Sequence, residues 1–376
     1  MDQVRVLQFI TPSGFYGAER WVLALANNID HSKLLCDLAV TDEGNGQDLS
    51  VAEYYPEAAG QVHYLPMNGR FDFRVVSHLV KTIRDREIDV IHTHGYKSDI
   101  LGLLAARKSG IKCVSTPHGF SGDVGFKLDT FIKMGAYCLR FFDKVAPLSE
   151  ALIEDMTNFK VPDNKIRFIR NGVDVKEIDA TITKLGVTTS STNSLPRSKT
   201  IGFIGQMIPR KGIPDLLKAF DQLYQKDNTL TLQLLGDGAA RSMLESMAST
   251  LGSADAIEFL GFRSDRLELL AKFDLFVMTS SLEGVPRCMM EAMAVGVPVA
   301  AYDIPGVDQL IEQGNTGLMA PYGDVSSLVD HCSSLLYTPE LAAKVSKMAR
   351  DKIDIQYSAA RMAKEYDVLF RELLGR

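Results

Sequence analysis

Strand-like and helix-like residue patterns alternate along almost the whole chain. Short apolar runs typical of buried strands, such as 4–10, are followed by segments of helical periodicity, such as 18–28 and 73–86. The candidate strands are 4–10, 36–41, 62–66, 89–93, 112–117, 143–147 and 166–169, followed by 200–204, 230–235, 257–260, 274–278 and 297–301. This alternation predicts parallel sheets covered by helices, an α/β architecture.

The alternation is interrupted once, near residue 190. Residues 188–194 are all Thr, Ser or Asn and have no hydrophobic periodicity, which is typical of a linker. A chain of 376 residues also exceeds the usual size of one domain. We therefore predict an N-terminal domain over 1–178, a linker over 179–198 and a C-terminal domain over 199–356.

The composition narrows the class of protein. A formal net charge of −6 argues against a nucleic-acid binder. The five cysteines lack metal-ligand spacing, and an odd number cannot form a complete disulfide framework, so a reducing cytoplasm is expected. No signal-peptide pattern precedes the first strand, and no apolar run approaches the ~18 residues of a transmembrane helix. We expect a cytoplasmic protein, with peripheral attachment to the inner face of the cell membrane as an open alternative.

The stretch from 275 to 300 carries the strongest signal for a ligand site. An apolar strand pattern is followed by a polar loop and then by a helical pattern that ends at Gly296. In an open parallel sheet, ligands bind at the carboxyl ends of the strands, where this loop lies. Glu291 is surrounded by methionine and alanine, so its carboxylate needs a partner. The candidate ligand-binding residues of the loop and helix are Glu283, Gly284, Val285, Pro286, Arg287 and Glu291.

Three segments of this stretch carry a family resemblance: Glu283–Pro286, Glu291–Ala294 and Gly296–Val299. Together they resemble the Glu-x7-Glu signature of retaining glycosyltransferases of the GT-B fold, in particular glycosyltransferase family 4 (glycosyl transferases group 1). The resemblance implies two facing Rossmann-like domains with a deep inter-domain cleft. The first domain would bind the acceptor and the second the nucleotide-sugar donor. The C-terminal helix, within 357–376, would cross back to the first domain.

A glycine followed by basic residues before a helix suits phosphate binding in the second domain. Lys211 can neutralise a diphosphate, and Arg210 can contact it through two hydrogen bonds. By the resemblance, Lys211 matches the phosphate-binding lysine of the family, whereas Gln206 replaces the usual arginine. Asp237 and Phe262 match segments that border the nucleotide base. Asp237 could equally cap the helix that follows it.

The loop after the first strand is a second candidate phosphate site, because a glycine-containing loop opens a helix there. Gly14 and Gly17 do not complete a dinucleotide fingerprint, which disfavours a Rossmann dehydrogenase. The segment resembles the Gly-Gly-Ala-Glu-Arg motif of family 4, in which Gly17 would bring its backbone near the donor diphosphate. Tyr16 stands in place of the first glycine and makes the loop bulkier.

Three histidines follow strands of the first domain. A metal site formed by His92, His94 and His118 is disfavoured on the expectation that His92 and His94 point to opposite faces of their strand. By the resemblance, His118 in Thr116–Gly119 faces the donor sugar as a catalytic residue. His94 is placed on the acceptor side. The alternative for these residues is that they satisfy loop backbone groups.

Asn171 begins an Asn-Gly-Val-Asp segment with which family members leave the first domain. Asn-Gly is also a turn signal, so a structural role is the alternative to an acceptor-side role for Asn171.

The predicted activity is transfer of a sugar, with retention, from a nucleotide sugar, expected to be a UDP-sugar, to a hydroxyl of a glycan or glycolipid acceptor. Lipopolysaccharide, capsule or other cell-envelope glycans are the expected products. Glu283, His118 and Lys211 are the candidate catalytic residues, and no protein nucleophile is assigned. No cofactor or metal is expected, because the chain contains no Asp-x-Asp motif. The alternatives are a nucleotide-sugar epimerase of the same fold and a two-lobed binding protein.

A further segment, 125–144, mixes aromatic and aliphatic residues with lysine and arginine. This mixture is typical of a helix that contacts an anionic membrane surface. The alternative is a helix packed on the core with solvated basic residues.

Overall fold

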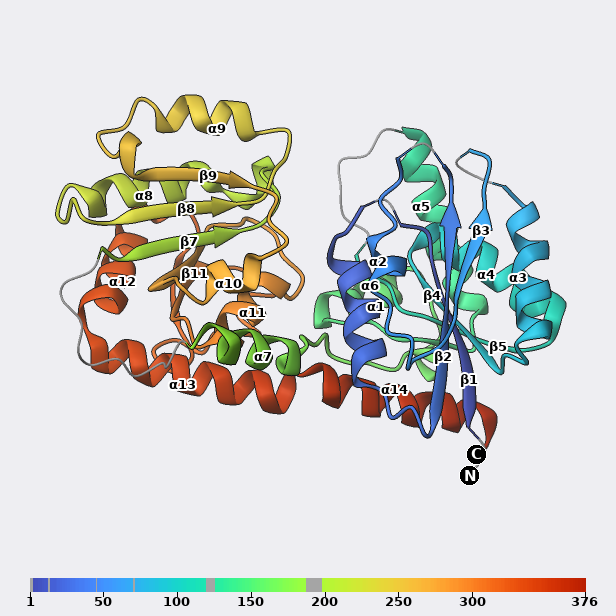
Figure 1. Ribbon diagram of the computed structural model, residues 1–376. Coiled ribbons are helices and arrows are strands. Elements are labelled where there is room, and N and C mark those ends of the chain that lie inside the picture. Colours follow the sequence, from blue (N-terminus) through green and yellow to red (C-terminus); the bar gives the residue numbers. More distant parts are fainter. Residues whose placement is uncertain (1–2, 13, 45, 70–71, 120–125, 187–197) are drawn as a thin grey trace. The chain divides into compact units, whose positions relative to one another are not determined.

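The computed structural model describes the chain except for residues 1–2, 13, 45, 70–71, 120–125 and 187–197, and except for the side chains of 126–130. The chain divides into two compact units. The first contains Met1–Asp174 and Ser358–Arg376, and the second contains Val175–Tyr357. Each unit holds one six-stranded parallel sheet with helices on its faces (Figure 1). The predicted α/β class is confirmed.

The sheet of the first unit has the strand order β3-β2-β1-β4-β5-β6. Its strands are β1 Val4–Ile10, β2 Leu34–Asp42, β3 Val62–Pro66, β4 Val90–His94, β5 Lys112–Ser115 and β6 Lys144–Val145. Its helices are α1 Gly17–Asn28, α2 Ser50–Glu53, α3 Arg74–Asp85, α4 Tyr96–Ser109, α5 Phe126–Cys138, α6 Glu150–Asn158 and α14 Ala359–Leu374, with short 3-10 turns at Leu139–Phe141 and Asp163–Lys165.

Successive residues of β1 enter two different cores. Val4 and Val6 pack with α1 and α14, whereas Leu7 and Phe9 pack with α3 and α4 on the opposite face. This alternation follows from the two-residue period of a strand, and it explains why β1 is apolar almost throughout.

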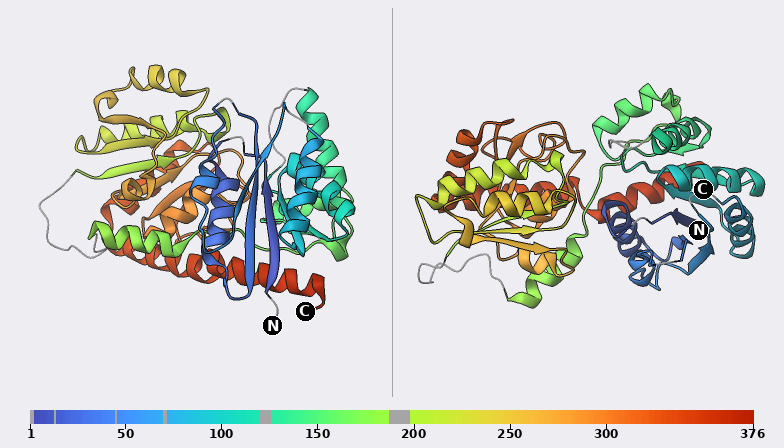
Figure 2. Two further views of the ribbon diagram at one scale, coloured as in Figure 1. Left: turned by 45° about the vertical axis from the view of Figure 1, so that its right-hand side comes forward. Right: turned by 90° about the horizontal axis from the view of Figure 1, so that it is seen from above.

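The C-terminal helix α14 belongs to the first unit, as the resemblance implied. The chain returns there after Tyr357, and α14 packs against α1 (Figures 1 and 2). Tyr366 and Phe370 are fully buried in this contact, and the N–H of Ala359 donates to the carbonyl of Val173 at 2.8 Å.

The sheet of the second unit has the order β12-β11-β10-β7-β8-β9. Its strands are β7 Thr200–Ile204, β8 Thr231–Leu235, β9 Ile257–Gly261, β10 Leu275–Met278, β11 Val299–Asp303 and β12 Leu318–Pro321. Its helices are α7 Val175–Leu185, α8 Ile213–Tyr224, α9 Arg241–Ala248, α10 Arg266–Leu270, α11 Arg287–Val295, α12 Val325–Tyr337 and α13 Pro339–Gln356, with 3-10 turns η3 at Pro209–Lys211 and η4 at Ala254–Ala256.

Both sheets have the strand order of a Rossmann fold. In each sheet the first and fourth strands along the chain are neighbours, β1 beside β4 and β7 beside β10. The connections after these two strands leave in opposite directions, so a crevice opens at the carboxyl ends of the pair. Each unit therefore has one topologically defined place for a ligand.

Three sequence predictions differ from the observed elements. Residues 166–169 form no strand, and Ile166 makes only an isolated bridge to Val145. The edge strand β12 was not predicted, because its four residues end in proline and resemble a loop. The first part of the predicted linker, 179–185, belongs to the helix α7, which begins at Val175 and packs against α10 and α11.

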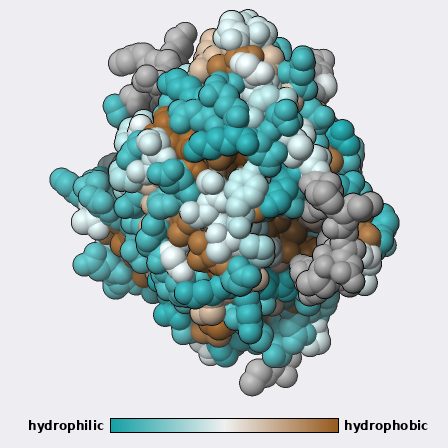
Figure 3. Space-filling view, turned by 90° about the vertical axis from the view of Figure 1, so that its left-hand side faces the viewer, coloured by the Kyte–Doolittle hydropathy of each residue, from teal (hydrophilic) through white to brown (hydrophobic). Residues whose placement is uncertain are grey.

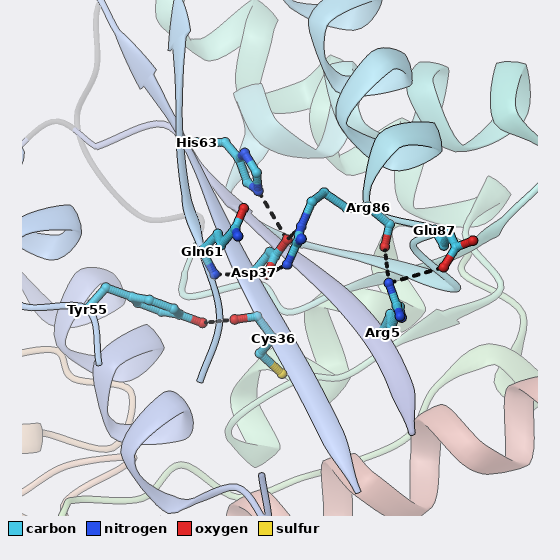
Figure 4. A network of polar contacts seen from close by, with 8 residues as sticks. All are labelled: Arg5, Cys36, Asp37, Tyr55, Gln61, His63, Arg86 and Glu87. Atoms are coloured by element: carbon cyan, nitrogen blue, oxygen red, sulfur yellow. Dashed lines mark hydrogen bonds and ion pairs between the residues drawn. The ribbon is translucent and has the colours of Figure 1, made fainter. Parts of the chain in front are cut away.

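A buried carboxylate ties β2 to the end of α3 in the first unit (Figure 4). Asp37 is fully buried and accepts hydrogen bonds from Nε of Arg86 at 2.6 Å and from the N–H of Gln61 at 2.9 Å, and Nε2 of His63 lies 3.1 Å away. Burial alone would raise the pKa of Asp37, but these hydrogen bonds outweigh it and hold the pKa well below its usual range.

None of the described helices combines the length and the apolar character needed to cross a membrane. On the face drawn in Figure 3, hydrophilic residues predominate, and hydrophobic residues appear in several separate patches between them.

Candidate active site

An ion pair lies at the carboxyl ends of β7 and β10, where the topology of the second unit opens a crevice. Nζ of Lys211, from the 3-10 turn after β7, is 2.5 Å from Oε1 of Glu283, from the loop after β10. The side chains are only 10% and 8% exposed. The structure therefore brings together two of the three predicted catalytic residues.

The two loops that carry this pair are joined by further hydrogen bonds. The N–H of Ser281 donates to the carbonyl of Arg210 at 2.8 Å, and Oγ1 of Thr279 donates to the carbonyl of Lys211 at 3.2 Å. Gly212 has a φ of +62°, and a Cβ there would lie 2.0 Å from the carbonyl oxygen of Thr279. Only glycine allows this approach, so the pair is held on a preorganised backbone.

Gln206 and Arg210, the other predicted donor-binding residues of this region, are exposed. Nη1 of Arg210 donates to the carbonyl of Leu282 at 3.3 Å. Arg210 and Lys211 are adjacent in the chain, yet the first lies at the surface and the second is buried.

Gly306, which follows β11 and supports the Glu283 loop, was not predicted as a site residue. Gly306 has a φ of +91°, and a Cβ there would lie 1.5 Å from the carbonyl oxygen of Gly284. Its N–H donates to Oδ1 of Asp308 at 2.8 Å. The Pro-Gly dipeptide at 305–306 was the available signal, because it marks a turn directly after a strand.

Glu291 lies on α11 and is 3% exposed. Arg266 holds its carboxylate through two hydrogen bonds, Nη2 to Oε1 at 2.9 Å and Nε to Oε2 at 3.3 Å. Nε of Arg287 also donates to Oε1, at 3.1 Å. The predicted need for a partner is confirmed, but Arg266 was not predicted, because no local pattern links it to a residue 25 positions later.

The start of α11 supplies donors for an oxygen-rich ligand. The N–H groups of its first turn have no acceptor within the helix. Pro286 is the N-cap of the helix and has no N–H, so this predicted ligand-binding residue cannot contribute an amide donor. Burial raises the pKa of the Cys288 thiol to about 12, which disfavours the thiolate form.

The loops after β7 and β8 are in direct contact, and the N–H of Gly236 donates to the carbonyl of Gly261, the last residue of β9, at 2.8 Å. Gly236 has a φ of +129°, and a Cβ there would lie 1.9 Å from the carbonyl oxygen of Gly205. Asp237 is exposed, and its carboxylate accepts from the N–H of Gly238 at 2.7 Å and from Nη1 of Arg241 at 3.0 Å. It does not cap α9, which begins after Ala240. The Phe262 ring is 60% exposed at the same edge of the sheet.

In the first unit, Gly17 is the first residue of α1. It is exposed, and a Cβ there would have no atom within 4 Å among its described surroundings. The Tyr16 ring lies over Gly14, where an added Cβ would be 2.3 Å from Cε2 of Tyr16. The bulk of Tyr16 is therefore directed at Gly14, and the packing of the fold does not require glycine at position 17.

The prediction that His92 and His94 point to opposite faces is wrong. Residues two apart on a strand share a face, and the two rings lie 4.4 Å apart between centroids. Nε2 of His92 is 2.7 Å from Oγ1 of Thr116, and that hydroxyl is 2.7 Å from the hydroxyl of Tyr366 on α14. Among the described residues, no group of three or more His, Cys, Asp or Glu side chains is arranged to hold a metal ion.

His94 is 4% exposed, and both of its ring nitrogens have partners within the unit. Nδ1 lies 3.2 Å from Nε2 of His118, and Nε2 lies 2.7 Å from Oε1 of Gln8. Burial, together with the nearby histidines, holds the pKa of His94 well below its usual value, so the ring is neutral. His118 is half-buried at the end of this chain of contacts.

Asn171 makes a turn with its own backbone. Its Oδ1 accepts from the N–H of Gly172 at 2.8 Å, and its carbonyl accepts from Nη2 of Arg361 at 3.2 Å. These contacts attach the segment to the start of α14 and favour the structural role.

The described part of the 125–144 segment is divided between core and surface. Leu139 and Phe142 are fully buried, whereas Tyr137 is 53% and Phe141 44% exposed. The guanidinium of Arg140 lies 4.7 Å from the centroid of the Tyr137 ring. Residues 120–125 and the side chains of 126–130 lie outside the described part.

Comparisons with known proteins agree with this architecture. Residues 15–177 match the family "Glycosyltransferase Family 4", and residues 189–352 match "Glycosyl transferases group 1". The chain is 26% identical over 315 residues to N-acetyl-alpha-D-glucosaminyl L-malate synthase of Bacillus anthracis, covering 81% of this chain and 80% of that protein. It is 27% identical over 277 residues to UDP-Gal:alpha-D-GlcNAc-diphosphoundecaprenol alpha-1,3-galactosyltransferase of Escherichia coli, covering 69% of each.

The same fold is found in crystal structures of HepE from Anabaena. Its complexes with UDP and with UDP-glucose have TM-scores of 0.79 and 0.78 to this chain, at 19% and 20% identity, and cover 98% and 99% of this chain and 100% of HepE. The two family matches together span most of both units. The chain is therefore a GT-B glycosyltransferase that belongs to glycosyltransferase family 4, the glycosyl transferases group 1.

Proposed function

We propose that this glycosyltransferase transfers a sugar from a UDP-sugar to a hydroxyl of a glycan or glycolipid acceptor, with retention at the anomeric carbon and without a metal ion. The observation that carries the proposal is the buried pair of Lys211 and Glu283 at the crevice between β7 and β10. A nucleotide sugar contains a diphosphate, which a buried cation can neutralise, and sugar hydroxyls, which a carboxylate can bind.

Lys211 would neutralise the departing diphosphate, together with the N-terminus of α11. The family resemblance adds the backbone of Gly17 to this role. Glu283 would hold hydroxyls of the donor sugar and orient its anomeric carbon. Glu291, oriented by Arg266, would accept hydrogen bonds from the ribose hydroxyls.

The remaining predicted contacts belong to the edges of the donor. Gln206 and Arg210 would border the phosphates, and Asp237 and Phe262 the base. Gly284, Val285 and Pro286 would line the sugar. The role of His118 toward the donor sugar rests on the family resemblance alone.

Two comparisons support a UDP-sugar donor. The Escherichia coli relative is named for UDP-Gal, and HepE was crystallised with UDP and with UDP-glucose. The acceptor named in the Escherichia coli relative is a sugar on diphosphoundecaprenol, whereas that of the Bacillus anthracis relative is L-malate. We infer a cell-envelope glycan or glycolipid acceptor from the first of these, with a cytoplasmic site of action at the inner face of the membrane.

The proposal that no metal ion is needed rests on the positive charge that the protein itself supplies at the site. A diphosphate carries about two negative charges, and Lys211 with a helix N-terminus supplies the compensation that a divalent cation provides in other enzymes. Activity should therefore persist in EDTA. Loss of activity in EDTA that Mg²⁺ or Mn²⁺ restores would contradict this part of the proposal.

The test is a screen of UDP-glucose, UDP-galactose, UDP-N-acetylglucosamine and the matching GDP-sugars. Binding is measured by thermal shift, since a ligand stabilises the folded state by mass action. Release of UDP is then measured with and without a membrane-lipid extract as acceptor. We expect one UDP-sugar to stabilise the protein and to release UDP only with acceptor. Conversion of the UDP-sugar to an epimer without acceptor would overturn the proposal, and the anomeric configuration of the product, read by NMR, tests retention.

A further inference from the structure

The loops that follow β1, β2 and β4 are tied together at the carboxyl edge of the first sheet. These strands are parallel neighbours in the order β2-β1-β4, and the crevice of this unit lies between β1 and β4. The Gln47 amide accepts from the N–H of Glu43 and donates to the carbonyl of Pro12, both at 2.7 Å. Nζ of Lys97, in the first turn of α4, is 3.1 Å from Oε1 of Glu43, which directly follows β2. Side chains from three loops therefore meet beside this crevice.

Tyr16, in the loop after β1, presents an aromatic ring at the same edge. The side chain is 51% exposed, yet its ring has a defined position against Gly14, where an added Cβ would lie 2.3 Å from Cε2 of Tyr16. The N–H of Tyr16 donates to Oε2 of Glu19 at 3.0 Å, which fixes the backbone at the start of α1. Tyr16 stands where the motif of family 4 has glycine, so the ring is a feature of this chain. The exposed half of the side chain can contact a ligand without rearrangement of the loop.

Lys97 and Glu43 form a partly buried pair, with 18% and 30% of their side chains exposed. A lysine without a carboxylate beside it would favour a negatively charged ligand. Here Glu43 balances the charge of Lys97, so the pair offers N–H donors and a carboxylate acceptor with no net charge. Hydroxyl groups both donate and accept hydrogen bonds, and they match such a pair.

We propose that Tyr16, Glu43 and Lys97 form the acceptor site of the first unit, and that this site binds a pyranose sugar. A pyranose has a face of C–H groups, which packs on an aromatic ring, and an edge of hydroxyl groups, which hydrogen-bonds to the charged pair. L-malate has no such face, and the neutralised lysine does not compensate its negative charges. The identity of the sugar as the acceptor rests on the proposed function, whereas the chemistry of the site rests on the geometry of the first unit.

Three substitutions test the ring. Tyr16→Ala removes it, and Tyr16→Phe keeps it without the hydroxyl. Gly14→Ala retains Tyr16 but displaces its ring, because the added Cβ would lie 2.3 Å from Cε2. The matched control is Tyr64→Ala, since Tyr64 is also 51% exposed but lies within the edge strand β3. A further variant, Glu43→Gln, leaves Lys97 without its carboxylate and should shift the site towards an anionic ligand.

Binding is measured by saturation-transfer difference NMR without a donor, so the result does not depend on turnover. The probes are the methyl α-glycosides of glucose, galactose and N-acetylglucosamine, with L-malate for comparison. We expect the wild type, Tyr16→Phe and Tyr64→Ala to bind at least one glycoside through the C–H protons of one face, and not to bind L-malate. Tyr16→Ala and Gly14→Ala should weaken this binding about fivefold or more, and Glu43→Gln should weaken it and bind L-malate. Thermal unfolding and UDP affinity confirm that each variant is folded.

Release of UDP with the membrane-lipid extract separates this site from the proposed function. Tyr16→Ala should need about fivefold more extract for half-maximal release at an unchanged UDP affinity, whereas Tyr64→Ala should match the wild type. A wild type that binds L-malate or none of the probes would overturn the inference, as would glycoside binding that survives in Tyr16→Ala. A wild type that binds a glycoside through Tyr16 but releases no UDP with the extract would instead refute the proposed function and confirm the sugar site.

Discussion

Lys211 and Glu283 neutralise each other in the second unit, with Nζ of one 2.5 Å from Oε1 of the other and both side chains buried. The proposed function gives them different targets, the diphosphate for Lys211 and the sugar hydroxyls for Glu283. A nucleoside diphosphate must therefore compete with Glu283 for the ammonium group. Removing this competition should therefore change nucleotide affinity and turnover in opposite directions.

Glu283→Gln should bind UDP more tightly than the wild type and turn over more slowly. The substitution leaves Lys211 without its ionic competitor, which we expect to be worth about 1 kcal/mol, or roughly fivefold in affinity. Turnover should fall because the amide holds the sugar hydroxyls less strongly than a carboxylate does. Titration calorimetry with UDP and initial rates measure the two effects. Glu312→Gln is the control, since it breaks another Lys–Glu pair of the same unit, with Lys352 at 2.9 Å. Weaker UDP binding in Glu283→Gln would contradict the competition.

Glu291→Gln should weaken UDP binding by about 1.5 kcal/mol, roughly tenfold, without changing the binding of inorganic pyrophosphate. The reason is that the carboxylate is proposed to contact the ribose and not the phosphates. Glu291→Ala should also destabilise the fold, because Arg266 and Arg287 would lose a carboxylate that is 3% exposed. Equal losses for UDP and pyrophosphate would contradict the ribose assignment.

Gly306→Ala should lower both stability and activity. A Cβ at this position would lie 1.5 Å from the carbonyl of Gly284, and a φ of +91° is strained for any other residue. We expect a loss of about 1–3 kcal/mol in the free energy of unfolding and at least a tenfold drop in kcat, because the Glu283 loop must move. The matched variant is Gly284→Ala, whose Cβ has no atom within 4 Å among the described residues and which should unfold like the wild type. A fully active Gly306→Ala would show that Gly306 does not support the loop.

Asp37 should make the protein sensitive to acid. Its pKa is held below the unfolded value of about 3.9, so its contribution to stability is present above that value and is lost as the pH falls below about 4. Asp37→Asn should lower the free energy of unfolding at pH 7 by about 1–3 kcal/mol, because Arg86 and His63 lose a charged acceptor. It should also flatten the acid side of the stability profile. Urea unfolding from pH 3 to pH 7 tests this, and parallel profiles for the two proteins would contradict it.

Local sequence patterns were sufficient to predict most of the fold. The ends of β1, β3 and β7 agree with their apolar runs, and Gly296 ends α11 in the left-handed conformation, as its position predicted. The edge strand β12 and the helix α7 were not predicted, because neither has a sequence pattern strong enough to distinguish it from a loop.

The candidate site was predictable only in part. Glu283, Glu291 and Lys211 each lie within a short sequence motif. Arg266 and Gly306 do not, because their role comes from tertiary contacts with Glu291 and Gly284. The contact of Gln8 with His94 was likewise not predicted, because the two residues lie on neighbouring strands that are far apart in the sequence. His92 and His94 were wrongly predicted to point to opposite faces of their strand.

The most direct test of the central claim is titration calorimetry of UDP and of uridine into the wild type, Lys211→Ala and Lys218→Ala. Lys218 is a control lysine of the same unit, half-exposed and paired with Asp215 on α8. We predict that Lys211→Ala loses at least tenfold in affinity for UDP while its weak binding of uridine is unchanged, and that Lys218→Ala behaves like the wild type. A Lys211→Ala protein that is folded and binds UDP as tightly as the wild type would contradict the assignment of this site to the donor diphosphate.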